Sequence, residues 1–297
     1  MSLYHLSHRA ILELTGDTVS AFLQDILTAD VAGLATGQMR QSCLLSPQGR
    51  ILIEMTIYQG PKTNLGADGA QEVVWIACDT SQIDELEQKL KLYKLRRNIT
   101  LTKRPDLCLL AHDEIIDNVI LSASDTRTSP SLTHSLIHKD YLSAHEILPL
   151  DLYHHWRLVN AIPEGPQDLT PNRALMLEAG LDFFDAVDFN KGCYIGQEVT
   201  ARTRYRGLVK RRFVPVTARA LSSGDTIFAD DKEVGTILSA VTCPAQDEDP
   251  PYMIGLASMR LSAIHDAEQG AALHTNHNDV RLAIPDHIRP IPDPNKS

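Results

Sequence analysis

The most informative stretch of this chain reads Lys191-Gly192-Cys193-Tyr194-Ile195-Gly196-Gln197-Glu198. A thiol reacts mainly as its thiolate, and neighbouring cations such as Lys191 favour that form. Two glycines within five residues let the backbone turn tightly or come close to a ligand. We therefore predict a reactive thiol at Cys193 in an electropositive loop. The alternative is an inert cysteine buried in a glycine-containing turn.

The residues that follow predict a short helix. Gln197–Arg202 has reasonable helical propensity, and Glu198 precedes Arg202 by four positions, the favourable order for an ion pair. If the helix begins near Gly196, Cys193 lies just before its N-terminus, where the helix dipole favours negative charge. This position agrees with the predicted thiolate.

A basic run continues beyond the helix. Six basic residues and no acidic residue lie between Arg202 and Arg212, although the chain as a whole has a net charge of −10. That overall charge disfavours a nucleic-acid-coating surface, so we expect no direct nucleic-acid binding. The basic run is either an anion site for a carboxylate or phosphate, or the solvated face of a strand.

Five widely separated cysteines indicate a reducing compartment, because an odd number without close pairs does not form a disulfide framework. No CxxC pair is present, so a metal or cluster would need ligands from distant segments or from a partner. No apolar run is long enough to span a membrane, and Met1–Leu6 has no secretory pattern. We expect a cytoplasmic protein without a membrane partner.

The order of predicted elements indicates an α+β region. An amphipathic helix beginning at Val19 precedes a hairpin whose turn is Ser46–Gly49. A strand at Val73–Cys78, a helix opened by Thr80 and further strands follow. Helices are also predicted over Leu152–Ile162 and Pro171–Gly180.

The pattern changes after Gly207, where short apolar runs alternate with Gly, Asp and Pro turns, as in a small all-β barrel or sandwich. We place an α+β region of two subdomains at 1–206, a β-barrel at 207–285 and a proline-rich, extended tail at 286–297.

Several motifs together indicate a family. The longest is KGCYIGQEVTAR at 191–202. The shorter, co-linear motifs are Phe22-Leu23-Gln24 with Thr28 and Asp30, Leu44–Arg50, Tyr93–Arg97, Trp156-Arg157 with Ile162–Glu164, and Tyr205–Gly207. In order and spacing this chain resembles the YgfZ branch of the folate-binding, glycine-cleavage T-protein superfamily.

The resemblance implies a T-protein-like α+β fold of two interlocked halves with a C-terminal β-barrel. It also implies a non-enzymatic accessory factor for the assembly, insertion or repair of [4Fe–4S] clusters in client enzymes, with an indirect link to tRNA modification. Cys193 would be the functional cysteine and a ligand to a shared iron–sulfur cluster, whose other thiolates come from a partner. That partner would be an A-type iron–sulfur carrier or a glutaredoxin.

Tetrahydrofolate is the small ligand that the resemblance implies. The candidate contacts are Lys191, Gly192, Tyr194, Gly196, Gln197, Glu198, Arg202, Arg206, Trp156, Arg157 and Glu54.

One departure from the superfamily separates two functions. The aminomethyltransferases of the superfamily carry an Asp-Asp pair in the hairpin, and this chain has Ile53 and Glu54 at those positions. Methylene transfer needs a carboxylate placed at the pterin, and an isoleucine cannot supply it. We therefore predict the accessory factor, with a folate-dependent aminomethyltransferase as the alternative.

Overall fold

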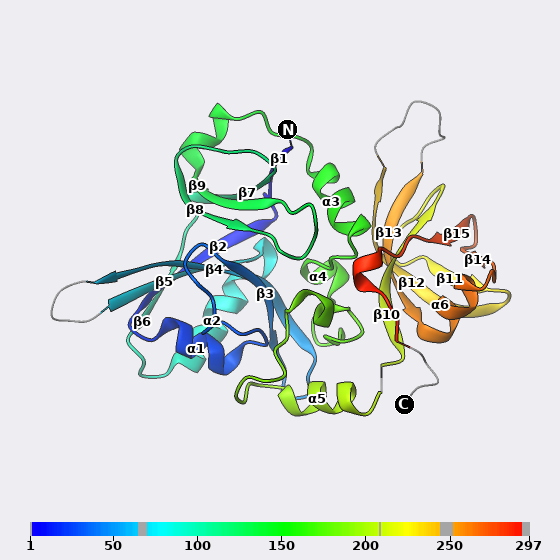
Figure 1. Ribbon diagram of the computed structural model, residues 1–297, viewed down its shortest axis with the longest axis horizontal. Coiled ribbons are helices and arrows are strands. Elements are labelled where there is room, and N and C mark those ends of the chain that lie inside the picture. The colour runs from blue at the N-terminus through cyan, green and yellow to red at the C-terminus, as the bar shows by residue number, and fades with distance from the viewer. Residues whose placement is uncertain (1, 65–69, 208, 244–251, 293–297) are drawn as a thin grey trace. The chain divides into compact units, whose positions relative to one another are not determined.

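The computed structural model describes residues 2–64, 70–207, 209–243 and 252–292 (Figure 1). Two compact units divide the chain. The first contains Met1–Leu150 and Phe184–Gln197, and the second contains Asp151–Phe183 and Glu198–Ser297. The chain therefore passes from one unit to the other three times.

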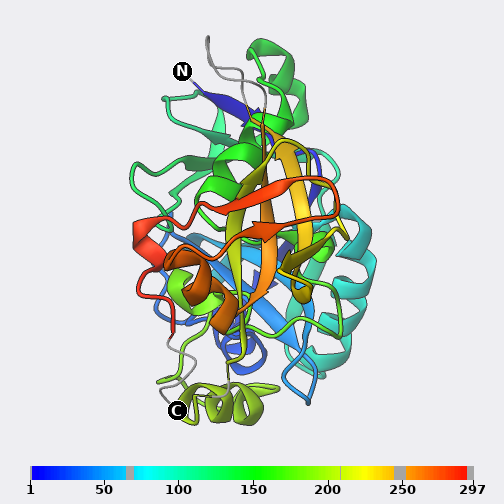
Figure 2. The same cartoon turned by 90° about the vertical axis from the view of Figure 1, so that its right-hand side faces the viewer.

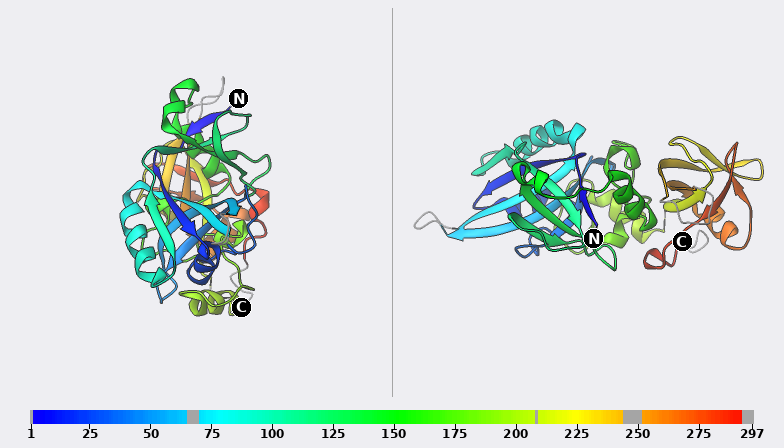
Figure 3. Two further views of the ribbon diagram at one scale, coloured as in Figure 1. Left: turned by 90° about the vertical axis from the view of Figure 1, so that its left-hand side faces the viewer. Right: turned by 90° about the horizontal axis from the view of Figure 1, so that it is seen from above.

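A five-stranded antiparallel sheet, in the order β3-β4-β5-β2-β6, forms the centre of the first unit. Its strands are β2 Arg9–Gly16, β3 Met39–Leu45, β4 Ile51–Asn64, β5 Ala70–Asp79 and β6 Ile99–Lys103. The predicted hairpin is confirmed as β3 and β4, and β4 and β5 form a long hairpin (Figure 3). The sequence prediction lacks β2, because burial along most of its length weakens the alternation that marks a strand.

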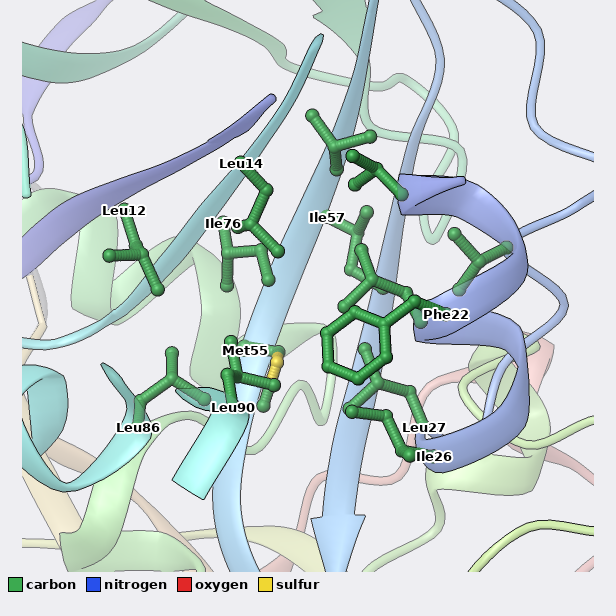
Figure 4. Packing of buried hydrophobic residues seen from close by; sticks show 14 of the residues in the cluster. Leu12, Leu14, Phe22, Ile26, Leu27, Met55, Ile57, Ile76, Leu86 and Leu90 are labelled. Atoms are coloured by element: carbon green, nitrogen blue, oxygen red, sulfur yellow. The ribbon is translucent and has the colours of Figure 1, made fainter. Parts of the chain in front are cut away.

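The apolar core of the first unit lies on one face of this sheet. Two helices, α1 Val19–Ile26 and α2 Ile83–Lys94, contribute to it, and Figure 4 shows Phe22 and Leu90 packed among strand side chains. The apolar spacing that predicts α1 is therefore the spacing of its buried face.

The opposite face of the sheet carries buried polar side chains, such as Glu54, beside apolar ones such as Tyr58 and Trp75. Ile53 belongs to the apolar core, and because side chains alternate along a strand, Glu54 lies on the other face. A second antiparallel sheet, in the order β1-β7-β9-β8, completes the unit. Its strands are β1 Leu3–His5, β7 Leu107–His112, β8 Val119–Ser124 and β9 Thr133–His138. The hydroxyl of Tyr58 on β4 lies 2.7 Å from Nδ1 of His134 on β9, which links the two sheets.

A closed six-stranded barrel, in the order β10-β13-β12-β11-β14-β15, forms much of the second unit (Figure 2). Its strands are β10 Arg211–Ala218, β11 Thr226–Ala229, β12 Lys232–Thr242, β13 Met253–Arg260, β14 Leu273–His274 and β15 Asp279–Leu282. The β-barrel predicted after Gly207 is confirmed, whereas its all-β character is not, because Leu261–Glu268 forms a helix between β13 and β14.

Four further helices are α3 Leu150–Val159, α4 Gly165–Asp168, α5 Gln197–Tyr205 and α6 Leu261–Glu268. The helix predicted over Pro171–Gly180 is wrong, because this stretch forms turns. Asn172 has a φ of +60° and Gly180 a φ of +75°, so the backbone leaves the right-handed region near both ends. Within the described part of the chain, no helix is long and apolar enough to cross a membrane.

A buried ionic network joins two of these helices to the barrel inside the second unit. Arg157 of α3 donates to Oδ2 of Asp168 at 2.5 Å, and Ser239 of β12 donates to Oδ1 of the same carboxylate at 2.5 Å. The Arg157 and Asp168 side chains are 5% and 0% exposed. Asp168, within residues 151–183, thus accepts a buried hydrogen bond from Ser239 of β12, which lies 71 positions later in the chain.

The stretch predicted as an extended tail is structured at its start. It forms a 3-10 turn at Asp286–Ile288, and Ile288 and Ile291 are buried. Residues 293–297 of the predicted tail lie outside the described residues.

Candidate functional site

The cysteine loop, residues 188–196, begins against the segment that follows α1. The Asp188 N–H donates to the Thr28 carbonyl at 2.9 Å, and the Thr28 hydroxyl donates to the Ala186 carbonyl at 2.7 Å. Thr28 is fully buried. Thr28 therefore holds the start of the loop, although it lies 158 positions before Ala186 in the chain. Local sequence patterns do not reveal a contact over this separation.

Lys191 extends this attachment. Its Nζ donates to the carbonyls of Leu27 and Ala29 at 2.7 and 2.8 Å, and it lies 5.2 Å from the centre of the Tyr194 ring. Leu27 is the C-cap of α1, where the helix dipole favours a cation. We predicted Lys191 as a cation that favours the Cys193 thiolate. In the structure its ammonium group is hydrogen-bonded to the main chain after α1.

Burial lowers the pKa of Lys191 from 10.5 to about 8, although the carboxylates of Asp30, Asp188 and Asp25 oppose the shift. A neutral amine keeps two N–H donors, which equals the number of carbonyls that it contacts here. The lysine can therefore hold the loop in either protonation state.

We expect the pH dependence of stability to report this shift. Between pH 8 and pH 10.5 the unfolded state binds more protons at Lys191 than the folded state, so the contribution of this residue to the unfolding free energy rises with pH. Lys191→Met removes that contribution. The difference between wild type and variant, measured by urea unfolding, should grow across this window, and a difference independent of pH would show that the ammonium is not desolvated.

The two glycines of the loop have different surroundings. Gly196 has a φ of +81°, and a Cβ built on it would lie 2.6 Å from the carbonyl oxygen of Ser46 and 3.1 Å from Cα of Gly49. The loop therefore rests on the β3–β4 turn at a contact that only glycine permits. A Cβ built on Gly192 meets nothing within 4 Å among the described atoms.

Cys193 lies between these glycines and is exposed, whereas Cys43, Cys78, Cys108 and Cys243 are buried. Burial raises the pKa of each of these four thiols, to about 12 at Cys78 and about 11 at Cys108. The alternative of an inert, buried Cys193 is wrong. The cationic, glycine-containing setting of Cys193 in the sequence distinguishes it from the other four cysteines.

Thiol labelling of the native protein should therefore give one fast reaction per chain. A neutral aromatic disulfide reagent at pH 7.5 should modify Cys193 within minutes, because attack requires an accessible thiolate. The other four thiols should react only after unfolding in urea. Cys193→Ser should abolish the fast phase, and a fast phase of two thiols would contradict the burial pattern.

Tyr194 belongs to the cysteine loop, and its side chain is buried, with 6% of the residue exposed. Burial, with a smaller contribution from Asp188, raises its pKa to about 12. Its hydroxyl is buried and has no hydrogen-bond partner among the described residues. The Gln197 N–H donates to the Tyr194 carbonyl at 3.2 Å, and this bond closes the turn that leads into α5.

The predicted helix is confirmed as α5, and most of its surface is solvent-accessible. Glu198, Val199, Arg202 and Tyr205 are exposed, and Thr200 is its one buried residue. In the described part of the chain, the side chains of Arg202 and Arg206 form no hydrogen bond or ion pair. Arg212, at the end of the same basic run, instead pairs with Asp182 at 2.6 Å and is buried.

Glu54 does not fit a ligand-binding role. Its carboxylate accepts bonds from Arg9 at 2.8 and 3.2 Å and from the Gln41 amide at 3.1 Å, and it is 2% exposed. Both oxygens are thus used inside the first unit.

Arg157 and Trp156 likewise make their contacts with other residues of the second unit. Arg157 is committed to Asp168, and its Nε also donates to His154 at 3.0 Å. Trp156 stacks on Tyr153 with ring centres 5.8 Å apart. The hydrogen bonds of Glu54 and Arg157 are therefore made inside the protein and not to tetrahydrofolate.

Cys193 does not belong to a cluster of metal-ligand side chains among the described residues. In residues 2–64, 70–207, 209–243 and 252–292, no group of three or more His, Cys, Asp or Glu side chains could hold a metal ion. Chemically, the site offers one accessible thiol on a loop anchored at both ends.

Comparisons with known proteins identify both parts of the fold. Residues 210–290 match a family model described as the CAF17 C-terminal β-barrel domain. The glycine cleavage system aminomethyltransferase T from Bartonella henselae aligns with a TM-score of 0.71, covering 97% of this chain and 86% of that chain at 15% identity. The predicted T-protein-like α+β fold with a C-terminal barrel is confirmed.

Relatives by sequence carry a functional name. The mouse protein named iron–sulfur cluster assembly factor IBA57, mitochondrial, is 31% identical over 237 residues, which are 72% of this chain and 65% of the mouse protein. The human protein of the same name is 30% identical and is covered to the same 65%. An IBA57 homologue from Mycosarcoma maydis is 26% identical over 96% of this chain and 85% of its own length. This chain thus spans slightly less than two thirds of its mouse and human relatives.

The cytoplasmic prediction is contradicted by these relatives, whose names place them in mitochondria. The prediction relied on dispersed cysteines and on the pattern of the first residues. Dispersed cysteines indicate a reducing compartment but do not distinguish one such compartment from another.

The YgfZ resemblance is supported at the level of the shared T-protein-like fold, while the relatives found carry the IBA57 name. A T-protein-like fold, a CAF17-type barrel and one exposed cysteine are thus combined in a chain that is similar in sequence to proteins named iron–sulfur cluster assembly factor IBA57.

Proposed function

We propose that this protein is an accessory factor of mitochondrial iron–sulfur cluster assembly, in which Cys193 supplies one thiolate to a cluster shared with a partner protein. The observation that carries this proposal is that Cys193 is the exposed cysteine among five. The names of the homologues support the process and the compartment.

A cluster that binds to one thiol of this protein needs a partner protein that supplies the other thiolates. Iron–sulfur clusters are held by several cysteine thiolates, and the cysteine loop offers one. The cluster is therefore cargo, bound between Cys193 and thiolates of an A-type carrier or a glutaredoxin. The clients are [4Fe–4S] enzymes, and an effect on tRNA modification would follow from loss of cluster-dependent modifying enzymes.

The aminomethyltransferase alternative is weaker. Catalysis at the pterin needs a carboxylate that can change its hydrogen bonds, but Glu54 is paired with Arg9, and Ile53 lies in the apolar core. The fold shared with an aminomethyltransferase at 15% identity does not by itself carry an activity.

The test is Cys193→Ser in cells from which the related mitochondrial factor has been deleted. Activity of a [4Fe–4S] dehydratase should stay at the level of the deletion strain, while wild-type protein restores it. Cys108→Ala, which removes a buried thiol, is the control and should restore activity. Full restoration by Cys193→Ser at normal abundance would overturn the proposal.

A further inference from the structure

The second unit contains a groove at one end of its barrel, far in sequence from Cys193. Its volume is about 900 Å³, and its polar lining includes Arg219, Tyr252, His274, His277, Asp279 and Arg281. We refer to it as the hairpin groove, because most of these residues belong to β14, β15 and the turn between them. The proposed function does not use it.

The groove is locally cationic in an acidic chain. Arg219 and Arg281 are exposed, and neither side chain has a hydrogen bond or ion pair with any residue that the structure describes. Among the described residues that line the groove, Asp279 is the one carboxylate. The charge of this groove is thus opposite in sign to the net charge of −10 of the chain.

His274, when protonated, adds a third positive group. Its Nδ1 lies 3.0 Å from the carbonyl oxygen of Thr275, and its Nε2 lies 3.0 Å from the carbonyl oxygen of Asp230. A carbonyl oxygen only accepts hydrogen bonds, so both ring nitrogens donate when both bonds are made, and the ring is then an imidazolium. The bonds to Thr275 and Asp230 accordingly raise the pKa of His274.

The pairing of β10 with β15 ends beside the groove. The register between these strands consists of two residue pairs, Val216 with Leu282 and Thr217 with Arg281. Arg219, which follows the last residue of β10, therefore lies beyond the paired part of the strand.

We propose that the hairpin groove binds an acidic peptide segment of another protein. The carboxylates of the segment contact Arg219 and Arg281. Guanidinium groups prefer carboxylates because two parallel N–H donors match two oxygens. The groove volume of about 900 Å³ is near the upper end of ligand pockets, about 300–1,000 Å³, which suits several residues of peptide better than one inorganic anion.

The test uses the full chain and a fluorescein-labelled hexapeptide with the composition of two Glu-Asp-Leu repeats. Fluorescence anisotropy should show saturable binding. The variant Arg219→Gln/Arg281→Gln should weaken it about tenfold or more, because it removes both guanidinium groups that pair with the carboxylates. Replacing Glu and Asp of the peptide by Gln and Asn should cause a similar loss.

Controls separate this site from general charge effects and from Cys193. Arg260→Gln changes an exposed arginine of the same unit outside the groove and should leave the affinity unchanged. Cys193→Ser should also bind the peptide normally, so failure of the proposed function does not affect this result. No saturable binding, equal binding by the double variant, or competition by phosphate alone at the concentration of the peptide would overturn the proposal.

Discussion

Gly196→Ala should destabilise the protein by about 2–5 kcal/mol, since a left-handed alanine costs about 1–2 kcal/mol and overpacking costs a further 1–3 kcal/mol. The added Cβ would meet the Ser46 carbonyl oxygen at 2.6 Å, and this neighbour belongs to the backbone and cannot rotate away. The cysteine loop would have to lift from the β3–β4 turn. Urea unfolding followed by circular dichroism measures the loss.

Gly192→Ala is the matched control, because it adds the same methyl group to the same loop where nothing lies within 4 Å. It should leave stability and fast labelling of Cys193 unchanged. Equal unfolding midpoints for the two alanine variants would show that the loop does not rest on the β3–β4 turn.

Arg9→Met should destabilise the protein by about 3–5 kcal/mol, the usual effect of removing one partner of a buried ion pair. The Arg9 and Glu54 side chains are each 1% exposed and lie 2.8 Å apart. The variant leaves the Glu54 carboxylate inside the protein without this guanidinium. Urea unfolding should show a lower midpoint at an unchanged slope.

The double variant Arg9→Met/Glu54→Met distinguishes pairing from packing. It should recover most of the loss, because removing both charges together avoids an uncompensated one. Lys103→Met, which breaks an exposed pair with Asp84, should have little effect. If the double variant were as unstable as Arg9→Met, the loss would come from packing of the arginine stem.

Local patterns in the sequence predicted the elements whose signal is contained in about ten residues. The stripe from Val19 to Ile26, the turn at Ser46–Gly49 and the propensity of Gln197–Tyr205 each gave an observed element. The helix predicted over Pro171–Gly180 does not form. Asn172 has a left-handed backbone conformation, which depends on tertiary structure and is not described by helix propensity.

The site was predictable only in part for a similar reason. The alternation of β4 already separates Ile53 from Glu54. By contrast, the partner of Glu54 is 45 positions away, and Lys191 reaches a carbonyl 164 positions away. Such pairings depend on how strands and loops meet in space, so Lys191, Arg157 and Glu54 appeared as free polar groups in the sequence and are internally bonded in the structure.

The path of the chain between the two units limits how the protein can be dissected. Residues 151–183 belong to the unit that contains the barrel, yet residues 184–197 return to the other unit before the barrel begins. Cutting the chain after residue 206 would separate Asp168 from its Ser239 partner and leave a buried carboxylate and arginine without their covering strand. The barrel is therefore no detachable module, and a gene fragment ending there would encode an incomplete fold.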